Sequence, residues 1–112
     1  MNLTIQLPHV SDSETMHAHA DHVLRFAMTR FTDVISEVRL RLVDENGPRG
    51  GVDQRCRVQV HLRRGGVVHV DGVHADPQVA IQQVTARAAR CVARQLSRER
   101  PGRGLERNEA RR

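Results

Sequence analysis

The chain of 112 residues contains no lysine, tyrosine or tryptophan, and Phe26 and Phe31 are its only aromatic residues apart from histidine. No stretch approaches the roughly 20 consecutive apolar residues of a membrane-spanning helix. The N-terminus lacks the basic segment and apolar run of a signal peptide, and two cysteines are too few for a disulfide framework. We therefore expect one compact, soluble domain in the cytoplasm.

The basic residues are all arginine and are unevenly distributed. Residues 1–76 hold nine arginines and ten acidic residues, a net charge of −1, whereas residues 77–112 hold nine arginines and three glutamates, a net charge of +6. A local excess of cations favours a polyanionic partner, with nucleic acid first and an acidic membrane surface second. The alternative is a compositional bias towards arginine that keeps the protein soluble.

Hydrophobic periodicity predicts four strands and two helices. Alternating apolar residues predict strands over residues 2–7, 34–43, 54–63 and 67–73. Ser11 and Glu14 have the spacing of a capping box, so a helix is expected from there to about Phe31. Asp76-Pro77 is a strong helix opening, and the second helix is expected to end near Arg98. A dense cluster of turn-forming residues predicts a loop over residues 44–52.

The resulting β-α-β-β-β-α order predicts an α+β fold. Because each strand has one apolar face, we expect a four-stranded mixed sheet with both helices on one side. Strands 1 and 2 should be parallel, and strands 2, 3 and 4 should form an antiparallel meander. Arg64-Gly65-Gly66 predicts a three-residue hairpin loop with a left-handed glycine, and Val68 and Val70 are expected opposite Leu62 and Val60. Residues 1–98 should form the domain, and residues 99–112 a flexible basic tail.

Four arginines of the second predicted helix form what we call the arginine row: Arg87, Arg90, Arg94 and Arg98. Their spacings of three, four and four residues place them on one helix face. Like charges at these spacings repel, and only Glu99 lies near enough in sequence to neutralise one end. Guanidinium groups about 5–6 Å apart suit a run of phosphates, so the row predicts phosphate binding. The alternative is a solvated helix face.

Two further features leave a choice between binding and ordinary packing. The outward face of the sheet carries Arg39, Arg41, Arg55, Arg57 and Arg63 but no aromatic residue, so solvent exposure is favoured there over a base-reading surface. Phe26 points away from the apolar stripe of the first helix. It either packs against the second helix, which we favour, or stacks on a nucleic-acid base.

The sequence contains no recognisable catalytic pattern. No serine or cysteine has a base partner, and no glycine-rich loop has the strand-to-helix setting of a phosphate loop. His17, His19 and His22 do not share a helix face with further ligands, and His61 and His69 form at best a two-ligand pair. Cys56 and Cys91 are interpreted as small buried hydrophobic residues. We expect no enzyme activity, metal, cofactor or small-molecule substrate.

The element order, the Asp76-x-x-x-Ala80-Ile81 helix opening and the arginine row together resemble the family of ribosome hibernation-promoting factors and ribosome-associated translation inhibitors. This family is also called the sigma-54 modulation proteins. The resemblance covers residues 1–98, and the stretch DENGPRGGVDQRC at 44–56 resembles a short-form branch.

The resemblance implies binding to the small ribosomal subunit, in the groove that holds messenger and transfer RNA, and a block of translation in stationary phase or stress. The arginine row matches the family's RNA-facing positions, and Arg25 and Arg30 are weaker candidates. Val79 and Gln82 replace an aromatic and an acidic residue that are frequent in the family. Because the sequence ends at 112 without the second domain of long members, we expect a monomer that does not pair ribosomes by itself.

Two other functions remain open from the sequence. An α-β-β-β-α core is also found in general double-stranded RNA-binding modules. A regulator that binds an acidic protein through residues 99–112 is the other alternative, and it would not need the arginine row.

Overall fold

The computed structural model describes residues 1–8, 13–44 and 53–99. Its elements follow the predicted order: β1 (Asn2–Gln6), α1 (Ser13–Met28), η1 (Thr29–Phe31), β2 (Ile35–Asp44), β3 (Gln54–Leu62), β4 (Val67–His74) and α2 (Pro77–Glu99). The first predicted helix thus ends at Met28 and continues to Phe31 as a 3-10 helix. Ser11, most of the predicted 44–52 loop and residues 100–112 of the predicted tail lie outside the described residues.

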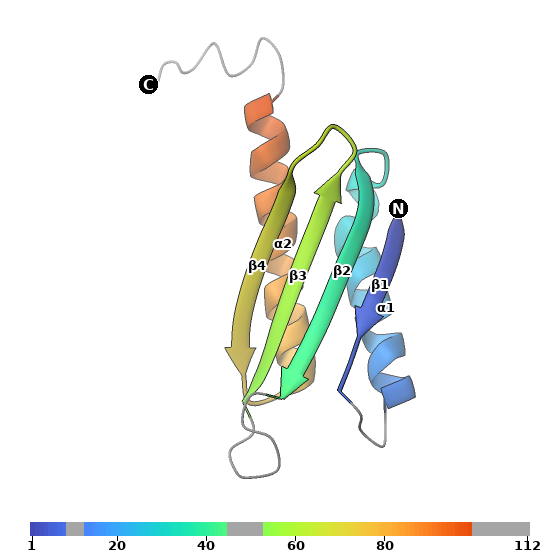
Figure 1. The fold of residues 1–112 in the computed structure, drawn as a ribbon, viewed down its shortest axis with the longest axis vertical. Helices are drawn as coiled ribbons and strands as arrows, with labels where there is room; N and C mark the ends of the chain where they lie inside the picture. Colours follow the sequence, from blue (N-terminus) through green and yellow to red (C-terminus); the bar gives the residue numbers. More distant parts are fainter. Residues whose placement is uncertain (9–12, 45–52, 100–112) are drawn as a thin grey trace.

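The four strands form one mixed sheet with the order β1-β2-β3-β4. Strands β1 and β2 are parallel, with Leu3 opposite Val38, and the β2-β3 and β3-β4 pairs are antiparallel. Both helices lie on the same face of the sheet, with α2 behind β3 and β4 and α1 behind β1 and β2 (Figure 1). Neither of these two helices covers the other face of the sheet (Figure 1). The predicted α+β architecture is confirmed.

The β3-β4 hairpin has the predicted three-residue loop length and left-handed glycine, but the loop spans residues 63–65 instead of 64–66 and the register differs. The Leu62 N–H donates to the Gly66 carbonyl oxygen at 3.1 Å, and the Gly65 N–H donates to the Leu62 carbonyl oxygen at 3.0 Å. Gly65 has φ +100°, in the left-handed region. This loop leaves Gly66 opposite Leu62, so the observed pairs are Val60–Val68 and Val58–Val70. The predicted pairing was wrong by two residues, a shift that keeps every side chain on its face.

The core lies between the helices and the sheet. Its buried helical side chains are Met16, Ala20, Leu24 and Met28 from α1 and Ala80, Ile81, Val84, Thr85, Ala88, Ala89 and Val92 from α2. Val38, Leu40, Cys56, Val58 and Val60 are the most buried side chains of β2 and β3 on the facing side, together with Ile35. No helix in the described ranges has both the length and the apolar character needed to span a membrane.

The start of α2 is fixed by Asp76, as predicted. An oxygen of its carboxylate, Oδ1, accepts a hydrogen bond from the Gln78 N–H at 2.9 Å. Its backbone carbonyl accepts one from the Ala80 N–H, also at 2.9 Å. The first bond satisfies an N–H that the first turn of a helix otherwise leaves unpaired, and the second is the first backbone bond of the helix itself.

Candidate nucleic-acid interface

The arginine row lies on the exposed side of α2, and all four side chains are exposed. Arg87, Arg90 and Arg94 line one hollow between α2 and β4, together with His69, Val70, Asp71 and Cys91. Arg98 lies one helical turn beyond Arg94 and does not line the hollow. None of the four arginines forms an ion pair within the described residues. Three of the predicted cations therefore converge on one concave surface without a carboxylate partner.

A glycine in β4 lets α2 lie close to the strand. A Cβ atom added to Gly72 would lie 2.9 Å from Val84 Cγ2 and 3.0 Å from Arg87 Nη1. Val84 is buried and β-branched, so it has little room to rotate away. Sequence reasoning overlooked Gly72. The signal was a glycine inside a strand pattern, which often marks close backbone approach.

The carboxylate beside the hollow is already neutralised. Asp71 accepts hydrogen bonds from Arg55 Nη1 at 2.6 Å and from Arg57 Nε at 3.1 Å, across the β3-β4 pair. Both arginines belong to the sheet. Asp71 therefore balances the charge of the sheet, and the cations of α2 remain available for an external anion.

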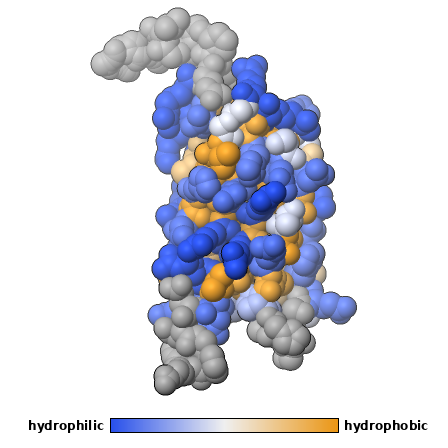
Figure 2. All heavy atoms as spheres, viewed as in Figure 1, coloured by the Kyte–Doolittle hydropathy of each residue, from blue (hydrophilic) through white to orange (hydrophobic). Residues whose placement is uncertain are grey.

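The open face of the sheet carries arginines with protein partners. Arg39 Nε lies 3.1 Å from Glu37 Oε2, which also accepts a hydrogen bond from Thr4 Oγ1 at 3.2 Å. The hydrogen bond from Arg39 is the largest cause that lowers the pKa of Glu37 below its usual value. The face is mostly hydrophilic, with apolar side chains between the polar ones (Figure 2).

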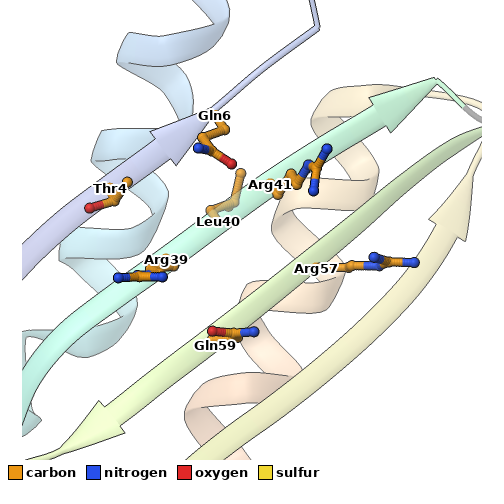
Figure 3. Close-up of a pocket in the computed structure, with 7 residues that line it drawn as sticks. All are labelled: Thr4, Gln6, Arg39, Leu40, Arg41, Arg57 and Gln59. Carbon is orange, nitrogen blue, oxygen red and sulfur yellow. The ribbon is translucent and has the colours of Figure 1, made fainter.

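A shallow hollow on this face is lined by Thr4, Gln6, Arg39, Leu40, Arg41, Arg57 and Gln59 (Figure 3). Arg41 has no ion-pair partner within the described residues, whereas Arg39 and Arg57 are paired. None of the lining residues is aromatic. The hollow therefore has no stacking platform of the kind that base-reading sheets use.

The two weaker candidates from the first helix are separated by the structure. Arg25 pairs with Asp21, with 3.0 Å between Nε and Oδ2. Arg30 places its guanidinium 4.6 Å from the centre of the Phe31 ring. Arg30 also lines a groove between α1 and α2 that Arg90 reaches from the other side, whereas Arg25 does not. The structure thus brings Arg30, but not Arg25, to the same groove as Arg90 of the arginine row.

The packing interpretation of Phe26 is wrong. Its side chain is 81% exposed on the surface of α1. The ring of His22, one turn earlier, lies nearly parallel to it, with 6.4 Å between the ring centres and 21° between the planes. The buried stripe of α1 reaches the core through other positions, so the groove between the helices is left open beside Phe26.

The cysteines and histidines differ in their environments. Burial is the main cause that raises the pKa of Cys56 to about 12, as expected of an inert thiol. Cys91 is only half-buried, contrary to the prediction, and its Sγ accepts a hydrogen bond from Arg94 Nη2 at 3.3 Å. His69 faces Gln59, so His61 and His69 are diagonal and not directly opposite. Among the described residues, no three potential metal ligands come together.

Comparison with known proteins identifies the family. A family model described as sigma 54 modulation protein / S30EA ribosomal protein matches residues 3–100. The chain belongs to this family. The resemblance proposed from the sequence is thereby confirmed for the sigma-54 modulation / S30EA family as a whole.

Two solved structures resemble this sigma-54 modulation / S30EA chain in fold, and each comparison covers 85% of the chain. One is the N-terminal domain of Protein Y from Thermus thermophilus, with a TM-score of 0.66, 23% identity and 99% of that chain covered. The other is a ribosomal subunit interface protein from Coxiella burnetii, with a TM-score of 0.66, 12% identity and 97% of that chain covered. The TM-scores establish a shared fold. No curated protein sequence matches the chain.

Proposed function

We propose that the chain is a non-catalytic, ribosome-associated translation inhibitor that acts by occlusion. The arginine row binds ribosomal RNA phosphates in the decoding groove of the small subunit, with Arg30 and Arg25 as minor contacts. The folded body then blocks the sites of messenger and transfer RNA. The protein acts in the cytoplasm and is a monomer when it is off the ribosome.

The observation that carries this proposal is that the arginine row forms no ion pair within the described residues. Guanidinium groups bind phosphate oxygens in bidentate fashion and remain charged at any physiological pH. A helix that served only its own stability would interleave carboxylates at spacings of three and four residues. The chain instead keeps three of these arginines around one hollow with no ion pair in the described residues.

Family membership supplies the partner. The family description includes a ribosomal protein, and one structural relative is named a ribosomal subunit interface protein. We extend this association to the chain. A polyanionic surface as large as a ribosomal subunit also suits the net charge of +6 that residues 77–112 carry.

The test is sedimentation of the purified protein with ribosomes, small subunits and large subunits through a density gradient at low and at moderate salt. Co-migration with small subunits and intact ribosomes, weakening as the salt concentration rises, is expected because phosphate contacts release counterions. Protein that stays at the top of the gradient at both salt concentrations would overturn the proposal.

Two controls separate this function from the alternatives left open by the sequence. A free RNA duplex that competes as well as small subunits would indicate a general duplex-binding module. Loss of binding after removal of residues 99–112, with the arginine row dispensable, would indicate a regulator that uses its tail.

A further inference from the structure

The groove between α1 and α2 combines an aromatic ring with an apolar wall. Its sides are formed by His22, Val23, Phe26 and Ala27 of α1 and by Thr85, Ala86 and Ala89 of α2. Phe26 is the most exposed large hydrophobic side chain in the described residues. A flat ring held at the edge of a groove, with a second ring nearly parallel to it, provides a surface on which another planar group can stack.

Cations border the same groove on both helices. Arg30 lies in η1, directly after the end of α1, and Arg90 belongs to the arginine row of α2. Neither forms an ion pair within the described residues. A ligand that fits this arrangement has a planar centre and negative charges on each side, which describes a nucleotide within an RNA strand. An apolar protein segment would leave both guanidinium groups beside an uncharged surface.

A polar group at the wall of the groove lacks a partner. Thr85 is 0% exposed, and its Oγ1 has no hydrogen-bond partner in the described part of the chain. A buried hydroxyl without a partner costs free energy, and native structures rarely leave one without a reason. Thr85 lines the groove, and a hydrogen bond with the edge of a bound base would satisfy its hydroxyl.

We propose that the groove between α1 and α2 binds one unstacked nucleotide of ribosomal RNA, with its base stacked on Phe26 and its flanking phosphates contacted by Arg30 and Arg90. The proposal rests on the proposed function, because it adds a base-binding site to the phosphate-binding row. Arg90 lines both the groove and the hollow beside β4, so one RNA strand can pass from one to the other.

The experiment measures the dissociation constant for purified small subunits over a range of salt concentrations, for the unaltered chain and for three variants. Phe26→Ala should weaken binding about 5- to 150-fold, the range found when a stacking side chain is removed. Phe26→Tyr keeps the flat ring and should bind within about threefold of the unaltered chain. The matched control is Val73→Ala on β4, which trims another exposed hydrophobic side chain and should change nothing.

The salt dependence separates stacking from charge. Phe26→Ala should leave the slope of log affinity against log salt unchanged, whereas loss of a phosphate contact reduces it by about 0.7–0.9. If the unaltered chain binds and Phe26→Ala binds equally well, the base site is wrong and the proposed function stands. If the unaltered chain does not bind small subunits, both are wrong.

Photocrosslinking identifies what Phe26 touches. A benzophenone amino acid in place of Phe26 should crosslink to ribosomal RNA in the bound complex. A crosslink to a ribosomal protein or to a second copy of the chain, with none to RNA, would overturn the proposal. Because Phe26 is 81% exposed, these substitutions are expected to leave the fold intact, and unchanged thermal unfolding would verify this.

Discussion

Arginines lie on two surfaces of this molecule, the open face of the sheet and the exposed side of α2. The two surfaces differ in how many of their arginines form ion pairs. On the sheet, Arg39 pairs with Glu37, and Arg55 and Arg57 share Asp71, whereas Arg41 has no ion pair in the described residues. On α2, the arginine row has no ion pair in the described residues. The number of cations therefore says less about binding than whether the fold supplies their counter-charge.

The largest expected effect comes from removing three cations from each surface in turn. Arg87→Ala, Arg90→Ala and Arg94→Ala together should weaken binding to small subunits by about 100- to 1000-fold at ~0.1 M salt, since each lost phosphate contact contributes about 0.7–0.9 to the log–log slope. The matched triple variant, Arg39→Ala, Arg55→Ala and Arg57→Ala, removes the same charge from the sheet. We expect this variant to weaken binding by about tenfold or less, because those guanidinium groups already form ion pairs within the protein. Equal losses of affinity for both triple variants would mean that ion pairing does not distinguish the two surfaces.

The position of α2 over β4 gives the next largest effect. Gly72→Ala places a Cβ atom 2.9 Å from Val84 Cγ2 and 3.0 Å from Arg87 Nη1. We expect the free energy of unfolding in urea to fall by about 1–3 kcal/mol, because the buried Val84 must shift. Binding to small subunits should weaken as well, since Arg87 is displaced.

A double-mutant cycle tests that reasoning. Val84→Ala removes the crowded methyl group, so the double variant should lose less stability than the sum of the two single variants. Strict additivity would mean that Gly72 does not set the distance between helix and strand.

Some parts of the molecule could be predicted from the sequence and others could not. Element order and inward faces were predictable because the periods of two and 3.6 residues are local properties. The hairpin register was not, since alternation is unchanged by a shift of two residues. The pairing of Asp71 with Arg55 and Arg57, 16 and 14 residues away, depends on that register and was equally hidden.

Phe26 illustrates a different limit. The helical periodicity of α1 correctly places Phe26 off the apolar stripe, but it does not say how close the second helix lies. The two helices leave a groove beside the ring, and the side chain is 81% exposed. Exposure at a helix–helix boundary depends on the distance between helices, which the sequence of one helix does not contain.

Alkaline pH should change the stability of the core without changing the charge of the arginines on either surface. The chain has no lysine or tyrosine, and arginine stays protonated, so its thiols are the main groups that titrate above pH ~9. Burial raises the pKa of Cys56 from 9.0 to about 12. The native state therefore keeps a proton that the unfolded state releases, and the free energy of unfolding should fall as pH rises through this window. We expect a loss of about 1 kcal/mol between pH ~9 and ~10.

The variants for this test are Cys56→Ala and Cys91→Ala, each compared with the unaltered chain by urea unfolding at both pH values. Cys56→Ala lowers stability overall because it leaves a cavity, but its stability should depend little on pH. Cys91→Ala is the matched control, because it removes a thiol but keeps Cys56. A decline with pH that persists in Cys56→Ala would assign it to another group.

The smallest expected effect comes from a substitution that removes a carboxylate partner from the arginines of the sheet, so that this face resembles the exposed side of α2. Asp71→Asn removes the carboxylate shared by Arg55 and Arg57 and so removes the ion pair that holds the Arg57 guanidinium. Affinity for a free RNA duplex should rise about two- to tenfold, with a steeper salt dependence. The matched control is Asp33→Asn, which makes the same change in net charge at an exposed carboxylate with no ion pair in the described residues. If both variants gain equally, net charge and not pairing distinguishes the two surfaces. If only Asp71→Asn gains, the carboxylates of the sheet are what keeps RNA on the helical side.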